Sequence, residues 1–189
     1  PQGCADYAFE QHILKSLNKK HGRSIVLWPH GVLFRDTERV FREKMLKDDV
    51  VEAVIGLGPN LFYNSPMEAC LLVCRWDKPK EHKGKVLFVN AVKEVTRQSA
   101  SSFLDENQVS KIHKAFTEFK NVSGFAKVVS NADILANKSN LSISLYVSEG
   151  TNGNGEKKLH EVVDSWLANS IELKDGTKEI FSMLENKKI

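Results

Sequence analysis

Apolar side chains near the start of the chain recur at the spacing of a helix. Phe9, Ile13 and Leu17 follow one another at intervals of four residues, and Leu14 lies beside them. Such a stripe is typical of an amphipathic helix that packs one face against a core. We therefore predict a helix that begins near Asp6, whose side chain is suited to capping the first turn, and that has this stripe on its buried face.

The next apolar segment has the length and the pattern of a buried strand. Ile25–Trp28 is a continuous apolar run without polar alternation, which favours a strand covered on both faces. A turn signal follows, a second helix is predicted from about Asp36 or Thr37, and Val50–Ile55 has the pattern of the next strand. A strand, a helix and a strand joined by short connections indicate a parallel α/β sheet.

The third predicted strand must run antiparallel to the second. A loop at 56–66 follows Val50–Ile55, and the apolar run Glu68–Trp76 comes directly after it. No room remains for the crossover helix that parallel neighbours require, so we predict a long hairpin. Val86–Val89 is predicted to be a further strand.

The second half of the chain carries weaker signals. Asp105 and Gln108 resemble a capping box at the start of an amphipathic helix. Residues 122–148 alternate weakly, and we expect one or two short strands there. A stretch rich in Gly and Asn then has the composition of a flexible linker, and two amphipathic helices are predicted after it. We divide the chain into a main domain, a linker and C-terminal helices, at 1–148, 149–155 and 156–189.

The composition is that of a globular protein. The 189 residues are 41% hydrophobic and 27% charged, and the net charge of +3 is too small to indicate a dedicated nucleic-acid binder. No apolar run approaches the ~20 residues of a membrane span, and the start of the chain lacks the features of a signal peptide. We expect a cytoplasmic protein without membrane contact. Because the chain opens with Pro1 rather than methionine, we expect an upstream part to be missing.

Self-contained catalytic or metal-binding motifs are absent from the sequence. There is no Gly-x-Ser-x-Gly, no phosphate-binding loop and no Gly-x-Gly-x-x-Gly after a strand. The six histidines do not cluster with carboxylates at metal-ligand spacing, so we predict no metal site. Cys4, Cys70 and Cys74 are too few for a disulfide scaffold. Cys70 and Cys74 lie an even number of residues apart in a predicted strand, so we expect reduced core thiols on one face.

The residues that follow two of the predicted strands form the candidate binding site. Ligands of open α/β sheets bind beyond the carboxyl ends of the strands, and the loops after the first and second strands lie there. Phe34, Phe62 and Tyr63 are candidates for a stacking platform for a base. Arg35 would meet a phosphate or a structural carboxylate. The alternative is that Phe34 and Leu61 simply fill the edge of the sheet.

Five segments carry a recognisable pattern. They are Asp6–Phe9, Leu27–Arg35, Val54–Ser65, Lys83–Ala91 and Asn137–Val147. In this order and register they resemble the adenine methylation subunit of type I restriction-modification enzymes. The run Pro-His-Gly-Val-Leu-Phe-Arg within the second segment is highly specific for that family.

The resemblance implies a fold and a reaction. The chain would be the C-terminal half of a Rossmann-like methyltransferase domain, whose seven-stranded sheet ends in an antiparallel strand. The family transfers a methyl group from S-adenosylmethionine to the exocyclic amine of an adenine that has left the DNA helix. Phe62 matches the position whose ring packs against the extruded base in related enzymes, with Tyr63 and Asn64 beside it. The rim of that pocket is predicted to consist of Pro29, His30, Gly31, Phe34 and Arg35.

Two parts of the family pattern are missing. The glycine-rich cofactor loop and the catalytic Asn-Pro-Pro-Phe/Tyr motif of the family lie upstream of the helix near Asp6, and neither occurs in this chain. We therefore expect the chain alone to be inactive and not to bind S-adenosylmethionine. Asn64-Ser65 replaces the usual Gly-Thr, and asparagine adopts the backbone angles of glycine less readily. Leu145 stands where the family usually has arginine.

The resemblance also implies partners, namely DNA, a DNA-specificity subunit and a restriction subunit. In the family the C-terminal region meets the specificity subunit, and Trp166 with its apolar neighbours is a candidate for that contact; these residues would equally pack on the domain itself. Two alternatives to the enzyme half remain: a non-catalytic module that docks a specificity subunit or DNA, and an unrelated α/β domain. A structure without an antiparallel hairpin over Val50–Trp76 would reject the family.

Overall fold

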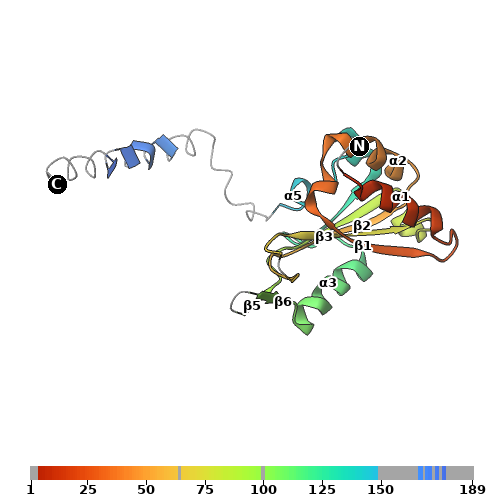
Figure 1. The fold of residues 1–189 in the computed structure, drawn as a ribbon, viewed down its shortest axis with the longest axis horizontal. Helices are drawn as coiled ribbons and strands as arrows, with labels where there is room; N and C mark the ends of the chain where they lie inside the picture. The colour runs from red at the N-terminus through yellow and green to blue at the C-terminus, as the bar shows by residue number, and fades with distance from the viewer. Residues whose placement is uncertain are drawn as a thin grey trace. The chain divides into compact units, whose positions relative to one another are not determined.

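The computed structural model describes residues 4–63, 65–98 and 101–148, together with the short stretches 166–167, 169–171, 173–174 and 176–177. The chain divides into two compact units, Pro1–Glu149 and Gly150–Ile189 (Figure 1). The described stretches of the second unit are helical. The predicted linker and most of the predicted C-terminal helices lie outside the described residues, so the three-part division stays a prediction.

A five-stranded mixed sheet organises the first unit, with the strand order β1-β3-β2-β4-β7. Its strands are β1 (Arg23–Pro29), β2 (Val51–Leu57), β3 (Ala69–Arg75), β4 (Lys85–Ala91) and β7 (Ala126–Ser130). A separate two-stranded hairpin consists of β5 (Thr96–Gln98) and β6 (Ser101–Phe103). β2 and β4 are parallel, β3 is antiparallel to both β1 and β2, and β7 is antiparallel to β4.

The hairpin that loop length predicts is confirmed. β2 and β3 pair antiparallel, with Val54 opposite Leu72 and Leu57 opposite Ala69. β3 also pairs antiparallel with β1, so it lies between β1 and β2, and those two strands run parallel without being neighbours. The predicted parallel relation of the first two strands is therefore also correct, and the helix between them is the crossover that such strands need.

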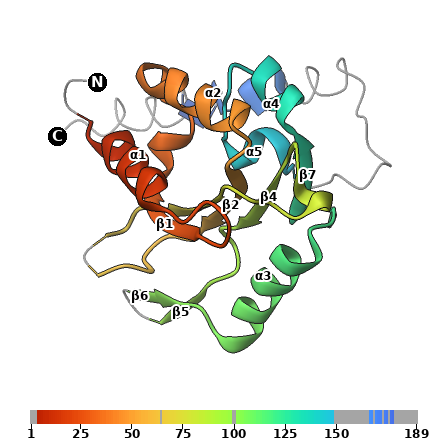
Figure 2. The ribbon, with the colours of Figure 1, turned by 90° about the vertical axis from the view of Figure 1, so that its right-hand side faces the viewer.

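Helices cover both faces of the sheet. They are α1 (Asp6–Ser16), α2 (Arg39–Lys47), α3 (Glu106–Glu118), α4 (Asn131–Ala136) and α5 (Ile143–Tyr146). Short 3-10 turns occur at η1 (His30–Leu33), η2 (Asp36–Glu38) and η3 (Lys80–His82). Figure 2 shows α1, α2, α4 and α5 on one side of the sheet and α3 on the other.

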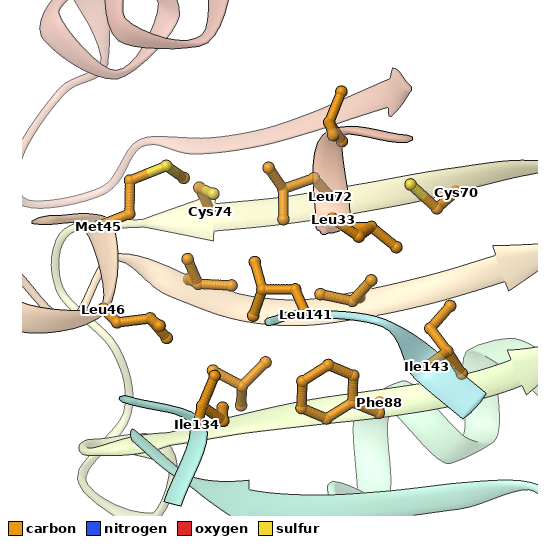
Figure 3. Packing of buried hydrophobic residues seen from close by; sticks show 14 of the residues in the cluster. Leu33, Met45, Leu46, Cys70, Leu72, Cys74, Phe88, Ile134, Leu141 and Ile143 are labelled. Atoms are coloured by element: carbon orange, nitrogen blue, oxygen red, sulfur yellow. The ribbon is translucent and has the colours of Figure 1, made fainter. Parts of the chain in front are cut away.

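Two apolar cores result from this layering, because successive strand residues point to opposite faces. On the face of α1, α2, α4 and α5, Leu72 and Phe88 pack with Leu33 and Ile143 (Figure 3). On the face of α3, the alternate strand residues join Ile112 in a smaller core. Every residue of β2 is buried, as expected for a central strand covered on both sides. Full burial of an aromatic side chain such as Phe88 contributes about 1.5–3 kcal/mol.

The predicted buried face of the first helix is correct for Leu14, which is buried, and wrong for Phe9. α1 buries Tyr7, Glu10 and Leu14, whereas Phe9 is 61% exposed. The residue that caps the helix is Ala5, which makes no side-chain cap bond, and Asp6 is the first helical residue. Polar partners select this face. The hydroxyl of Tyr7 donates to the carbonyl of Val32 in η1, and the indole of Trp28 in β1 donates to a carboxylate oxygen of Glu10. The periodicity of apolar residues does not predict either hydrogen bond.

The expectation that the first strand is covered on both faces is also wrong. β1 lies at the edge of the sheet, and its burial alternates from residue to residue. Ile25 is 60% exposed and Leu27 is 41% exposed, and both point to the face of α3. That helix packs on β4, at the other end of the sheet from β1.

Other local predictions are confirmed. Asp105 and Gln108 form a reciprocal capping box at the start of α3, with both hydrogen bonds at 2.9 Å. The weakly alternating stretch 122–148 contains one strand of the main sheet, β7, followed by α4 and α5.

Candidate functional site

The two loops predicted to hold the site begin at the same edge of the sheet. Pro29, at the end of β1, and Leu57, at the end of β2, both pair with Ala69 on the strand between them. The turns that start at Pro29 and Asn60 are therefore only a few residues from a common point. This agrees with the position expected for ligand-binding loops of an open α/β sheet.

The sheet nevertheless separates the two loops. The first loop folds over the face of α5, where Leu33 joins the larger core and the ring Nε2 of His30 lies 3.0 Å from the carbonyl of Ala69. Leu61 and Phe62 pack instead against the core on the face of α3. Phe34 and Phe62 line different cavities, so among the described residues they do not form one stacking platform.

The cavity beside Phe62 is apolar. It has a volume of about 510 Å³, within the usual range of ligand pockets. Its lining comes from the sheet, the loop after β2 and the β5–β6 hairpin: Leu27, Leu57, Leu61, Phe62, Leu71, Ser102, Phe103 and Leu104. Phe62 is half-buried, so one part of its ring packs on the core and the rest is available to a ligand. We refer to this space as the Phe62 cavity.

The tip of the second loop is a tight turn. The amide of Ser65 donates to the carbonyl of Phe62 at 3.0 Å, and these two residues form an isolated bridge. Tyr63 lies at the tip and is 95% exposed, whereas Asn64 lies outside the described residues. Asn60 has a positive φ of 59°, which asparagine tolerates better than most side chains. The backbone thus presents Phe62 to the cavity and Tyr63 to solvent.

The first loop has a smaller and more polar cavity of about 300 Å³. His30 and Phe34 line it, and Asn90 and Ser142 contribute polar groups from β4 and from the residue before α5. Phe34 is 50% exposed at its mouth. Of the predicted rim residues, His30 and Phe34 line this cavity, on the opposite face of the sheet from Phe62, whereas Pro29, Gly31 and Arg35 are not among its lining residues.

Arg35 acts as a structural cation. Its guanidinium makes ion pairs with Asp6 at 2.9 Å and with Glu38 at 3.2 Å, which ties the loop to α1 and η2. Burial tends to lower the pKa of Arg35, but the bond to Asp6 and the charge of Glu38 raise it above its ordinary value. A Cβ on Gly31 would lie 2.6 Å from Nε of Arg35, so glycine allows the side chain to fold back over the loop. Of the two predicted roles, the structure favours the contact with carboxylates.

Sequence reasoning missed the groups that hold the first loop from inside. Arg42 is buried and donates to the carbonyls of Val32, Arg35 and Ser139. Tyr7 donates to the same carbonyl of Val32 at 3.0 Å. A charged residue at the helical spacing of the buried face of α2 was the available signal, because an arginine there must find acceptors.

The buried cysteines match their predicted role. Cys70 and Cys74 both belong to the larger core, and burial raises the pKa of Cys70 to about 12. Both thiols are therefore protonated and unreactive at neutral pH. In the part of the chain that the structure describes, no three His, Cys, Asp or Glu residues are placed to hold a metal ion. No helix among those same residues is long and apolar enough to cross a membrane.

The glycines at the end of β2 allow neighbouring segments to pack closely. A Cβ on Gly56 would lie 2.8 Å from the side chain of Ile143, and one on Gly58 would lie 2.5 Å from the carbonyl of Val92. Protein atoms therefore occupy the space that a larger residue would need at either position.

Comparison with known proteins defines the family. Residues 1–154 match the model of the N-6 DNA Methylase family. The chain belongs to the N-6 DNA methylase family. It is 41% identical over 152 residues to the methylase subunit of the type I restriction enzyme MjaVIII of Methanocaldococcus jannaschii, covering 78% of this chain and 26% of that protein.

A solved N-6 methylase relative has the same fold. The methyltransferase subunit of a type I restriction-modification system from Streptococcus thermophilus gives a TM-score of 0.74 at 29% identity, over 78% of this chain and 31% of that one. The EcoKI M protein gives a TM-score of 0.61 at 12% identity over 98% of this chain and 45% of that one, which shows the fold alone. The chain spans about a quarter of the length of the curated relative from Methanocaldococcus jannaschii. The predicted family and fold class are confirmed.

Proposed function

We propose that this chain is the C-terminal half of the methyltransferase domain of a type I methylation subunit and supplies the side of the pocket that receives the target adenine. The complete enzyme would transfer a methyl group from S-adenosylmethionine to the exocyclic amine of adenine in DNA. The family supports this reaction. The assignment of the half rests on the loop after β2.

The observation that carries the proposal is the half-buried ring of Phe62 at an open apolar cavity, at the carboxyl edge of the sheet. A base that leaves the DNA helix loses its stacking, at a cost of a few kcal/mol. Stacking on an aromatic side chain returns about 1–3 kcal/mol per base. Phe62 would provide that surface, and the exposed ring of Tyr63 and the amide of Asn64 would meet the base or its backbone at the tip of the loop.

The edge of the sheet supports the proposal that more of the domain joins this chain. β1 is an edge strand with exposed Ile25 and Leu27, and no charged residue lies between Ser24 and Pro29. Edge strands of complete proteins are usually protected by charge, proline or a covering segment. The rest of the domain would cover this edge and carry the cofactor loop and the Asn-Pro-Pro motif.

S-adenosylmethionine would supply the methyl group from that other half. The residues of this chain would contribute binding and positioning of the base, since the family's glycine-rich cofactor loop does not occur in its sequence. We therefore expect calorimetry with this chain alone to show no saturable binding of S-adenosylmethionine. Saturable micromolar binding would contradict the proposal that the other half of the domain binds the cofactor.

Replacement of Phe62 in the complete subunit tests the proposal. Phe62→Ala removes the stacking surface, so kcat/KM for methyl transfer should fall about fivefold to 160-fold, which corresponds to the 1–3 kcal/mol of one stacked base. The melting temperature should change little, because the ring is only half-buried. Phe9→Ala is the matched control, since Phe9 is exposed on α1 and lines none of the cavities above. Equal losses of activity and stability in Phe62→Ala would mean that the ring serves only the core.

A second candidate is a non-catalytic module that docks a DNA-specificity subunit. Trp166, Leu167, Ile171 and Leu173 in the second unit are exposed. Large apolar side chains of this kind are typical of protein interfaces. A relative of the same fold was solved in a study of complex assembly in a type I restriction-modification system. This role is compatible with the enzyme half, whereas the loss of methyl transfer in Phe62→Ala would be unexplained by docking alone.

A further inference from the structure

The β5–β6 hairpin is part of the wall of the Phe62 cavity. The amide of Ser102 on β6 donates to the carbonyl of Asn60 at 2.8 Å, which fastens the hairpin to the loop that presents Phe62. On the neighbouring strand β5, the hydroxyl of Thr96 donates to the carboxylate of Asp105 and accepts from the side-chain amide of Gln108, both in the α3 capping box, at 3.2 Å each. The hairpin is thereby fixed between the loop and α3, and its side chains have defined positions beside the cavity.

Among the described residues that line the Phe62 cavity, Ser102 is the only polar one. Only 7% of its surface is exposed, and its hydroxyl oxygen is buried without a hydrogen-bond partner among the described residues. Burial of an unpaired hydroxyl costs about 1–3 kcal/mol, so proteins rarely retain one without a reason. The side chains of the other seven described lining residues are apolar, so none of these side chains offers the hydroxyl an acceptor.

We propose that Ser102 is a base-contacting residue, whose hydroxyl is buried in the ligand-free structure and turns about its side-chain bond to form a hydrogen bond with the polar edge of the purine held against Phe62. This inference rests on the proposed function, and it names the polar contact of that same cavity. Apolar walls with one polar group suit a flat heteroaromatic ligand, because the walls bind its faces and the polar group fixes its orientation.

The chemistry of serine suits this task. A hydroxyl both donates and accepts, and rotation about one side-chain bond redirects it without movement of the backbone. An adenine edge carries ring nitrogens that accept and an amine that donates. A buried polar group that only the correct ligand satisfies also rejects ligands without that group, since binding them leaves the hydroxyl unpaired.

Two variants of the chain itself test whether the hydroxyl is unpaired without ligand. Ser102→Ala removes it, so the melting temperature of the chain should stay the same or rise by about 2 °C. Ser101→Ala is the matched control on the same strand, where the exposed hydroxyl bonds the carbonyl of Gln98 at 3.3 Å. A lower melting temperature for Ser102→Ala than for the control would show that the hydroxyl stabilises the fold, and would overturn the inference.

The same variants in the complete methylation subunit test the contact with the base. On a DNA duplex that the wild-type subunit methylates, Ser102→Ala should lower kcat/KM about tenfold, equivalent to about 1.4 kcal/mol. Ser102→Thr keeps a hydroxyl and should stay within about threefold of wild type, and Ser101→Ala should be unchanged. A kcat/KM for Ser102→Ala within twofold of wild type overturns the inference and leaves the proposed function standing. Absence of methyl transfer by the wild-type subunit assembled with its DNA-specificity subunit overturns both.

Discussion

Arg42 offers the sharpest test of how the first loop is held. The side chain is 1% exposed, and it donates from Nε to the carbonyl of Ser139 at 2.9 Å and from Nη1 to the carbonyls of Arg35 at 2.9 Å and Val32 at 3.2 Å. It thus joins α2 to the loop after β1 and to the segment between α4 and α5. Ser139 has a positive φ of 54°, a strained conformation that this bond helps to hold.

The replacement Arg42→Met keeps the length of the side chain and its helix propensity but removes all three hydrogen bonds. At about 1–1.5 kcal/mol net for each bond, the loss is about 3–4 kcal/mol. The carbonyl of Val32 still receives the hydroxyl of Tyr7, so we expect the lower end, about 3 kcal/mol. For a domain of this size that corresponds to a fall in melting temperature of roughly 6–12 °C.

Urea unfolding of the chain, followed by tryptophan fluorescence, measures the loss directly. Arg39→Met is the matched control, because Arg39 is an exposed arginine on the same helix, and it should cost less than about 0.5 kcal/mol. Amide exchange of residues 30–36 should increase in Arg42→Met and not in the control. A destabilisation below about 1 kcal/mol for Arg42→Met would refute the view that these bonds fix the loop.

Three further outcomes are expected. Burial raises the pKa of the Glu10 carboxyl in the folded protein, so the free energy of unfolding falls as the pH rises from the ordinary carboxyl pKa through the raised pKa. Glu10→Gln should remove that fall, and unfolding curves at pH 4 and pH 7 would measure it. Gly58→Ala should cost about 1–3 kcal/mol in urea unfolding, because its Cβ would meet a backbone carbonyl at 2.5 Å, and a neutral result would contradict that contact. A thiol reagent should modify Cys4 in the native protein but Cys70 and Cys74 only after denaturation, and native modification of more than one thiol would be inconsistent with the buried pair.

The loops after β1 and β2, which carry the family-like motifs, line two different cavities at one edge of the sheet. Both loops start beside Ala69, yet one lies over the face of α5 and the other over the face of α3. Phe62 and Ser102 belong to one cavity, whereas His30 and Phe34 belong to the other. The first loop is thereby available for a separate contact, and its arginine is engaged in ion pairs with Asp6 and Glu38 rather than presented to solvent.

The sequence alone determined the elements whose cause is local. The capping box of Asp105 and Gln108 depends on residues three apart, and the β2–β3 hairpin follows from a loop too short for a crossover. The buried central strand was visible as the largely apolar segment Val50–Ile55, because a strand covered on both faces needs no alternating polar side, although the burial of Glu52 within it was not predicted. The family itself could also be predicted from the sequence, because the residues that match it form short contiguous motifs.

Only the tertiary structure decided which face each amphipathic segment buries and which loop residues share a cavity. α1 buries Tyr7 and Glu10 because Tyr7 finds an acceptor on η1 and Glu10 finds a donor on β1. These partners lie 25 and 18 residues further along the chain, so no local pattern predicts them. Phe34 and Phe62 are separated because the sheet lies between them. Ser102 contacts Asn60 because the β5–β6 hairpin, which is distant in sequence, docks against the loop after β2. Such contacts depend on which face of the sheet each side chain points to and on the order of the strands. The pattern of residues along the chain does not determine that strand order.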